Sequence, residues 1–344
     1  MRGVFEVGDT KSKPGEIVKG TLGSVEISDG TKATTPLINI NGTEDGPVLT
    51  VVGGVHGYEL SPIGALLAAA KSIDPRKLRG AFLGIPIGNP LAVRDGVYTT
   101  PTDGLNLSGP WYLPAKDQST AYITQRMAYQ INKALEPADY VLDMHANPYP
   151  SMPFVLINYE MCKDEKTKAE TKRIAEAYGV TVINNPRKMA SSMRDICGSH
   201  GKPSLTPELA GNRYMFDSII DVGKKGILNV MKAIDMIDGE PEQQDVKVIP
   251  GDLLGRGQLC CQRGGFMYVI KEPGEPASKG ETVVEITDVY GDVVDEVKMP
   301  IDGYCWSFTG GANGVHAVSE GQRVAYIFTE RSNVPDEQIF VEKA

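Results

Sequence analysis

The stretch Val51-Val52-Gly53-Gly54-Val55-His56-Gly57-Tyr58-Glu59 decides the fold of this chain. Its first two residues end the apolar, β-branched run at 47–52 (PVLTVV), which predicts a buried strand. The glycines let the backbone turn sharply and approach a ligand closely. The run that follows, from 61 to 71 (SPIGALLAAAK), predicts a helix with proline in its first turn. A strand, a tight turn and a helix in this order are typical of an open α/β sheet, whose ligands bind beyond the carboxyl ends of its strands.

Two side chains of this turn are candidate metal ligands. His56 and Glu59 are three residues apart, a spacing that can direct an imidazole nitrogen and a carboxylate at one cation. The same pair is equally compatible with a loop histidine and a helix N-terminal glutamate favoured by the helix dipole. The pair alone therefore leaves both readings open.

Composition describes an ordinary globular protein. The chain has 344 residues, of which 41% are hydrophobic and 23% charged, and its net charge is −9. No cluster of Lys and Arg favours nucleic acid as a partner, and no run has the roughly 18 apolar residues of a membrane span. We expect a cytoplasmic protein, because the N-terminus lacks a signal-peptide core and the five cysteines show no C-x-x-C spacing. A homo-oligomer is compatible with the sequence, which does not fix the number of subunits.

Strands and helices are expected to alternate along the central part of the chain. Further strands are predicted at 81–87, 139–144, 180–183 and 203–209, and further helices at 117–135 (with Asp117 as a cap), 163–178 and 216–237. The segment 91–116 shows no period and predicts a long functional loop. This pattern predicts an α/β fold with a doubly wound mixed sheet.

The chain divides into three expected parts. Residues 1–46 form an N-terminal β-rich segment and residues 47–238 an α/β domain. A polar stretch with Pro and Gly at 238–245 marks a boundary. Residues 246–344 then carry short strand patterns and many glycines, which predicts a C-terminal all-β domain.

Two more candidate residues stand at predicted strand ends. His145 directly follows the strand at 139–144, and Glu208 lies near the end of the strand at 203–209. A His/Glu/His set is typical of hydrolytic zinc sites that keep a fourth position open. A separate carboxylate then transfers protons, and Glu208 is the candidate, although it could equally be an ordinary strand-end carboxylate. The other histidines, His200 and His316, lie in glycine-rich loops and are expected to be structural or on the surface.

Five motifs in a fixed order resemble the succinylglutamate desuccinylase/aspartoacylase family, whose members are relatives of zinc carboxypeptidases. They are GGVHGYE, GNPLAVRDG, TDGLNL, DMHANP and TPELAGN. The resemblance covers nearly the whole chain and implies a zinc carboxypeptidase-like fold with a β domain at the end. It also implies one Zn²⁺ per chain, bound by His56, Glu59 and His145, with Glu208 as general base and acid. Family members hydrolyse the amide of N-acylated amino acids, and one branch deacetylates N-acetyl-diaminobutyrate.

The chain departs from this family where arginines are expected. Tyr98 stands in place of one arginine, and Ser108-Gly109 in place of an Asn-Arg pair. Such arginines would stabilise an oxyanion and hold a substrate carboxylate. Arg94 is a candidate substitute or, equally, a surface arginine, and Asn106 and Tyr98 are candidate substrate-binding residues. Because of these substitutions we expect an uncharged, cyclic or cationic N-acyl substrate.

The C-terminal domain resembles a lipoyl- or biotinyl-type barrel through KGETVVEITD and MPIDGYCW. Val289 stands where the lipoylated lysine would be, and Lys298-Met299 lies away from the hairpin position of biotin carriers. We therefore expect neither lipoate nor biotin, and a β domain that forms a wall narrowing access to the zinc.

The sequence leaves two classes of function open. The first is a zinc-dependent amidohydrolase that cleaves the non-peptide C–N bond of a small N-acyl compound. The second is a metal-binding or sensing protein with weak or lost hydrolase activity, suggested by the absent arginines.

Overall fold

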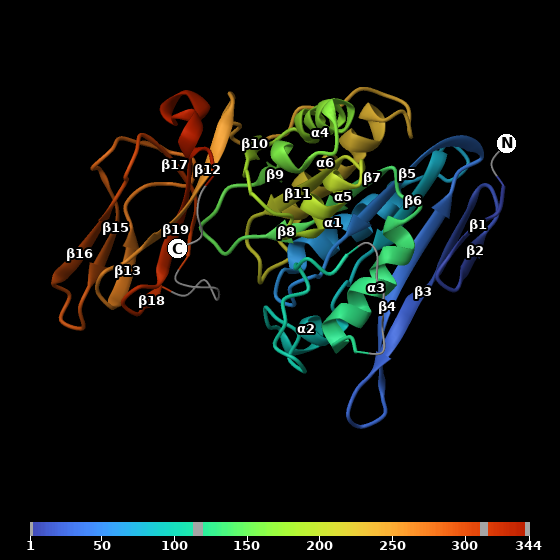
Figure 1. Ribbon diagram of the computed structural model, residues 1–344, viewed down its shortest axis with the longest axis horizontal. Helices are drawn as coiled ribbons and strands as arrows, with labels where there is room; N and C mark the ends of the chain where they lie inside the picture. The colour runs from blue at the N-terminus through green and yellow to red at the C-terminus, as the bar shows by residue number, and fades with distance from the viewer. Residues whose placement is uncertain (1–2, 113–119, 310–315, 341–344) are drawn as a thin grey trace.

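The computed structural model describes residues 3–112, 120–309 and 316–340, and a mixed sheet runs through most of it (Figure 1). Its strands follow one another in the order β14 (Pro276–Ala277), β17 (Gly303–Phe308), β19 (Arg323–Glu330), β12 (Leu253–Cys260), β10 (Thr181–Asn184), β9 (Phe154–Ile157), β11 (Ser204–Leu209), β7 (Tyr140–Asp143), β5 (Glu44–Val52), β6 (Arg79–Ile85), β4 (Lys32–Asn41) and β3 (Glu16–Glu26), with β8 (His145–Ala146) beside β11. A separate hairpin, β1 (Phe5–Val7) and β2 (Thr10–Ser12), lies next to β3 and β4.

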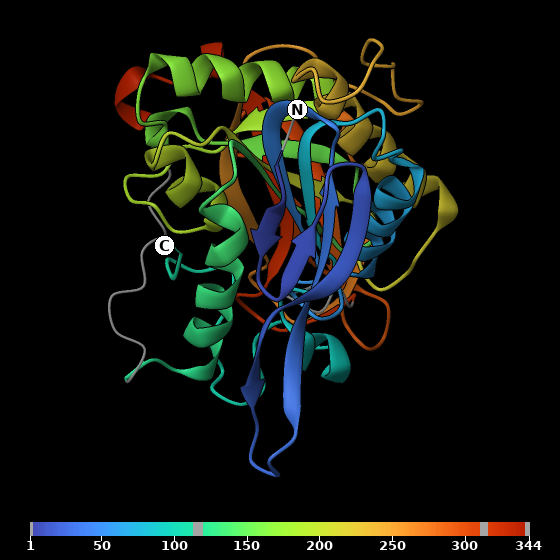
Figure 2. The same ribbon diagram turned by 90° about the vertical axis from the view of Figure 1, so that its right-hand side faces the viewer.

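Helices cover both faces of the central sheet (Figures 1 and 2). One face packs against α1 (Leu60–Ser72), α4 (Glu165–Tyr178) and α6 (Asp217–Ala233). The other face packs against α3 (Ile123–Leu135) and α5 (Met193–Ser199). The short helix α2 (Pro90–Asp95) follows β6. The predicted doubly wound mixed α/β architecture is thus confirmed.

Strand β5 shows how the sequence produces the two cores. Its side chains alternate, so Leu49 and Val51 enter the core with α1 and α6, while Val48 and Val52 enter the core with α3. β5 lies parallel to both β6 and β7. A strand buried on both faces needs apolar residues at successive positions, which explains the continuous run at 47–52.

The predicted elements are largely present. The structure has strands at or near each predicted position and helices in place of those predicted at 61–71, 163–178 and 216–237. The predicted cap Asp117 lies outside the described residues, within which α3 begins at Ile123. β9 and α5 were not predicted. Nor was α2, which lies almost wholly inside the segment expected to be a loop.

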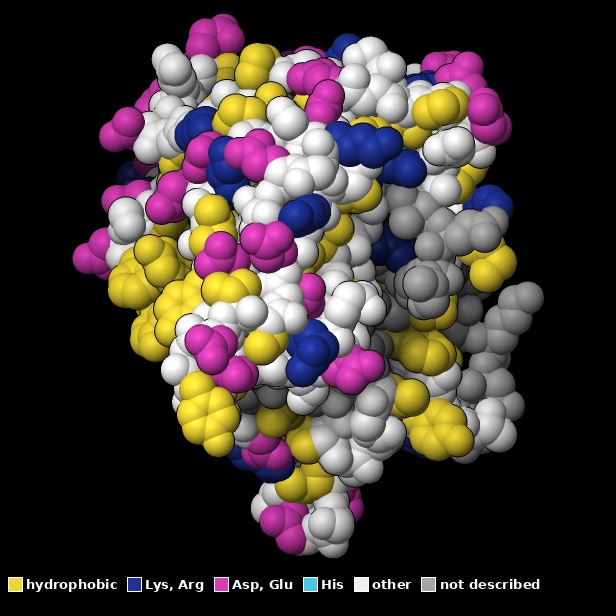
Figure 3. Space-filling model, turned by 90° about the vertical axis from the view of Figure 1, so that its left-hand side faces the viewer, with side chains coloured by type: hydrophobic (Ala, Val, Ile, Leu, Met, Phe, Trp, Pro, Cys, Tyr) yellow, Lys and Arg dark blue, Asp and Glu magenta, His cyan; other side chains and the backbone are white. Residues whose placement is uncertain are grey.

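The described part of the C-terminal region is built mainly of strands. Four of them form a second sheet in the order β16 (Val293–Lys298), β15 (Thr282–Thr287), β13 (Gly265–Val269) and β18 (Ala317–Val318), and two 3₁₀ turns, η2 (Arg331–Asn333) and η3 (Asp336–Gln338), follow β19. The all-β character is confirmed, whereas a closed barrel and the three domain limits stay predictions. Figure 3 looks onto this end of the molecule, where hydrophobic side chains are exposed among charged ones. Phe266 and Tyr290 are among the exposed hydrophobic residues of this region.

No helix in the described part of the chain combines sufficient length with sufficient apolar character to cross a bilayer.

Close packing of α4 on α6 yields a first prediction. A Cβ added at Gly226 in α6 would lie 2.2 Å from Cζ of Tyr178, a fully buried side chain at the end of α4. We expect Gly226→Ala to lower the free energy of unfolding by about 1–3 kcal/mol, because overpacking outweighs the gain in helix propensity. Urea unfolding followed by circular dichroism measures it. Asp221→Ala, at an exposed position of the same helix, is the control, and equal stability of the two variants would contradict the packing argument.

Candidate metal centre and active site

The turn between β5 and α1 positions the first two candidate ligands. A Cβ at Gly57 would lie 1.8 Å from the carbonyl oxygen of Ala92, so only glycine allows this approach of the turn to α2. Glu59 is the N-cap residue of α1, and its backbone N–H donates to the carbonyl of His56 at 3.2 Å. His56 and Glu59 therefore lie on one turn with their side chains on the same side.

Strand pairing brings the other two candidates to this turn. Val52 at the end of β5 pairs with Asp143 at the end of β7. His145 follows in β8, where it pairs with Glu208 of β11. The ends of β5, β7 and β11 thus bring three distant segments of the sequence, which carry His56 with Glu59, His145 and Glu208, to one place.

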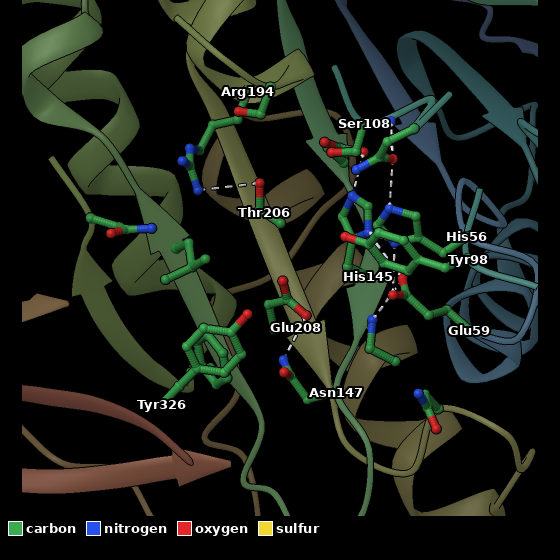
Figure 4. A pocket seen from close by; sticks show the side chains of 18 of the residues that line it. His56, Glu59, Tyr98, Ser108, His145, Asn147, Arg194, Thr206, Glu208 and Tyr326 are labelled. Carbon is green, nitrogen blue, oxygen red and sulfur yellow. Dashed lines mark hydrogen bonds and ion pairs between the residues drawn. The ribbon is translucent and has the colours of Figure 1, made fainter. Parts of the chain in front are cut away.

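Three of these side chains converge on one point (Figure 4). The Nδ1 atom of His56 lies 2.8 Å from Oε1 of Glu59, and Nδ1 of His145 lies 2.9 Å from Oε2 of Glu59. The two Nδ1 atoms are 3.2 Å apart. All three residues are buried, and a ligand atom from each lies within 4.8 Å of the others.

The outward-facing nitrogen of each histidine has its own partner. Nε2 of His145 lies 3.1 Å from Oδ1 of Asp143, and Nε2 of His56 lies 3.0 Å from Oδ1 of Asn106. Tyr98 stacks on the His56 ring with 3.8 Å between ring centroids. These contacts hold both rings with Nδ1 directed inward. Metal-binding histidines are usually oriented in the same way, by an acceptor for their other ring nitrogen.

Opposite charges dominate the electrostatics of this group. Burial alone would raise the pKa of Glu59, but His56 and His145 outweigh burial and lower it. Burial would likewise lower the pKa of His145, yet Asp143 and Glu59 raise it well above its usual value. The site thus stabilises positive charge beside the Glu59 carboxylate. Two inward nitrogens, a carboxylate and fixed outer partners fit a divalent cation with nitrogen and oxygen preference, such as zinc.

Glu208 lies beside this group without belonging to it. Its Oε2 accepts a hydrogen bond from Nδ2 of Asn147 at 2.8 Å. Burial raises the pKa of Glu208 to about 8, against an opposing effect of His145 and with a further increase from Glu59. A carboxyl group whose pKa lies near neutral pH is suited to general acid–base chemistry.

All but one of the candidate residues line one cavity of about 420 Å³. His56, Glu59, Tyr98, Asn106, His145 and Glu208 are among its lining residues. Arg94 is not among them, because its exposed guanidinium pairs with Asp95 at 2.7 Å. His200 is also outside, with Nδ1 2.9 Å from the carbonyl of Ile196.

The cavity contains residues that the sequence analysis missed. They come from the strand ends, from the segment after β10 and from the C-terminal strands, and include Asp143, Asn147, Arg187, Arg194, Asn212, Trp306, Arg323 and Tyr326. The sequence did hold a signal for Asp143, which ends β7 and precedes His145 by two residues. The C-terminal strands β17 and β19 supply one wall, so the expectation that the β domain borders the site is supported by these lining residues.

A comparison with protein-family models decides the relationship. Residues 45–234, more than half of the chain, match the succinylglutamate desuccinylase/aspartoacylase catalytic domain. The chain belongs to this family. The matched residues include all four of the strand-end candidates from His56 to Glu208.

Individual relatives cover most of the chain at low identity. It is 23% identical to N-alpha-acetyl-L-2,4-diaminobutyric acid deacetylase of Halomonas elongata over 71% of this chain and 72% of that protein. Its fold is similar to the succinylglutamate desuccinylase/aspartoacylase of Rhodobacter sphaeroides (24% identity, 91% and 96% coverage, TM-score 0.77). The product-bound ectoine utilization protein EutE of Ruegeria pomeroyi is also similar (21% identity, 92% and 96% coverage, TM-score 0.79).

The geometry makes a prediction about metal binding. His145→Ala removes one of three inward ligand atoms, so we expect purified protein to lose most of its bound zinc. Asp143→Asn keeps His145 but replaces the carboxylate that contacts its Nε2 atom. We expect the affinity for zinc to fall about 10- to 100-fold, the usual effect of removing such a partner. Metal analysis and competition with a chelating dye measure both effects. His200→Ala removes a histidine outside the cavity and should retain zinc as the parent does; equal zinc content in all variants would rule out this site.

Proposed function

We propose that this protein is a zinc-dependent hydrolase that cleaves the amide bond of a small N-acyl compound. The observation that carries the proposal is the buried convergence of His56, Glu59 and His145 next to Glu208 in one cavity. Membership of a family of deacylases supports amide hydrolysis as the reaction. The deacetylase of Halomonas elongata supports an N-acyl amino acid or amine as the class of substrate.

The ligand set supplies the electrophilic part of this chemistry. When bound by His56, Glu59 and His145, the metal would provide a positive charge that polarises the amide carbonyl and favours the ionised form of Glu208. Asp143 and Asn106 keep the two rings in the orientation that this binding needs.

Glu208 carries the proton transfers in this mechanism. Its carboxylate accepts a proton from the attacking water and then donates it to the leaving nitrogen. The hydrogen bond from Asn147 engages one carboxylate oxygen, Oε2, so Oε1 would be the oxygen that exchanges the proton. Trp306 is among the residues that line the cavity around Glu208.

The arginines that line the cavity change the expectation about the substrate. That expectation rested on Tyr98, Ser108 and Gly109 in place of cationic groups. The structure nevertheless brings Arg187, Arg194 and Arg323 to the same cavity from other elements. The substitutions alone therefore give no basis for preferring an uncharged or cationic substrate.

Replacing Glu208 tests the hydrolase assignment. We expect Glu208→Gln to lower kcat at least 100-fold on N-acyl amino acids, because the amide can no longer accept the proton, while zinc content stays at the parental level. Turnover of a panel of N-acetyl amino acids, N-acyl amines and esters by the zinc-loaded parent is the reference measurement. Glu240→Gln, an exposed glutamate outside the cavity, is the matched control. Zinc binding without turnover of any compound by the parent would instead favour the metal-sensing alternative.

A further inference from the structure

Tyr98 presents an unpaired hydroxyl group to the cavity. The residue lies between α2 and α3 and lines the cavity together with the His/Glu/His group. Within residues 3–112, 120–309 and 316–340, no hydrogen bond engages this hydroxyl. The hydroxyl of Tyr326, another lining residue, instead accepts a hydrogen bond from Nη1 of Arg323. The Tyr98 hydroxyl is therefore the one of these two that is open to a ligand.

Two contacts fix Tyr98 relative to the candidate metal ligands. Its ring stacks on the His56 ring, with 3.8 Å between the ring centroids and 20° between the planes. The preceding residue is held as well, because the backbone N–H of Gly57 donates to the carbonyl of Val97 at 2.8 Å. The turn that carries His56 and Glu59 thus also holds the ring of Tyr98 and the backbone beside it.

The hydroxyl end of this side chain is directed into the cavity. Figure 4 shows the Tyr98 ring beside His56, with its hydroxyl end toward the side of Glu208. Glu208 itself lies next to the His/Glu/His group and lines the same cavity. A fixed hydroxyl donor and a separate carboxylate thus border the place where the reacting amide would lie.

Amide hydrolysis needs a donor at the carbonyl oxygen in addition to a base. When water adds to the carbonyl carbon, the π electron pair of the C=O bond moves onto the oxygen, while Glu208 takes a proton from the water. The pair re-forms the C=O bond when the C–N bond breaks and the proton passes from Glu208 to the nitrogen. Donors that are held in place before the reaction stabilise the negative charge that the oxygen carries in between.

A tyrosine hydroxyl has the chemistry that this position requires. A phenol, whose pKa is ordinarily about 10, stays protonated at neutral pH. It can therefore donate a hydrogen bond to the charged oxygen without giving up its proton. Because the ring is already stacked on His56, little side-chain freedom is lost when the bond forms.

We propose that Tyr98 is a catalytic residue whose hydroxyl donates a hydrogen bond to the carbonyl oxygen of the scissile amide. The inference rests on the proposed function and deepens it, because it assigns a protein group to the charge that develops on that oxygen. The hydrogen bond is stronger to the charged oxygen than to the planar amide, so its loss lowers kcat more than it changes KM.

Removal of the hydroxyl alone tests this role in catalysis. Tyr98→Phe keeps the ring that stacks on His56. We expect kcat on the preferred compound of the N-acyl panel to fall about 100-fold, the lower end of the usual effect of losing one such donor. KM should change by less than about threefold, and the zinc content should stay at the parental level. Tyr290→Phe removes an exposed hydroxyl outside the cavity and should behave as the parent.

Binding of an oxyanion tests the same donor without turnover. Methylphosphonate presents charged tetrahedral oxygens, as the attacked carbonyl does, whereas imidazole binds a metal through one nitrogen and offers no oxygen. Calorimetric titration of the zinc-supplemented protein measures both. We expect Tyr98→Phe to weaken the binding of methylphosphonate roughly 10- to 100-fold, the usual effect of a hydrogen bond to a charged group, and to leave the binding of imidazole unchanged.

Three results would overturn the assignment: parental kcat in Tyr98→Phe, parental methylphosphonate binding in this variant, or a loss of zinc that parallels its loss of activity. Ser108 also lines the cavity, and a loss confined to Ser108→Ala would assign the donor to that hydroxyl instead. If the parent hydrolyses no compound while methylphosphonate binding depends on the Tyr98 hydroxyl, the proposed reaction is rejected and Tyr98 remains an oxyanion-binding residue.

Discussion

The register of three neighbouring strands determines the site. Val52 of β5 faces Asp143 of β7, and Glu208 of β11 faces His145 of β8, so the chain must place these strand ends at one level of the sheet. A shift of one residue along any of them would turn every side chain of that strand to the other face. The two hydrophobic cores fix this register, because each face of β5 buries its own set of apolar side chains. The arrangement of His56, Glu59, His145 and Glu208 thus depends on packing away from the cavity.

Burial of several charged groups at one place would raise the free energy of the folded state if these groups did not contact one another. Glu59, His145 and Asp143 form a chain in which each polar group contacts the next, and Asn106 completes it on the His56 side. Such a chain limits side-chain motion, since every rotation would leave a buried group unsatisfied.

The sequence predicted the parts of this molecule that depend on local pattern. The apolar run at 47–52 and the glycines after it predicted the strand and turn, and His145 and Glu208 were found because they stand at strand ends. Arg187 and Tyr326 could not be found in this way, because neither lies in a periodic pattern and only tertiary packing brings them to the cavity. Arg94 was a candidate by its position in a motif, yet its side chain turns to Asp95 at the surface.

One wall of the cavity comes from β17 and β19, more than a hundred positions after most of the other lining residues. Trp306 and Tyr326 on these strands line the cavity, whereas none of the three candidate metal ligands or Glu208 belongs to them. One wall of the cavity and the His/Glu/His group with Glu208 therefore lie in separate stretches of the sequence. Substitutions in β17 and β19 can change the shape of this wall without replacing any of those four residues.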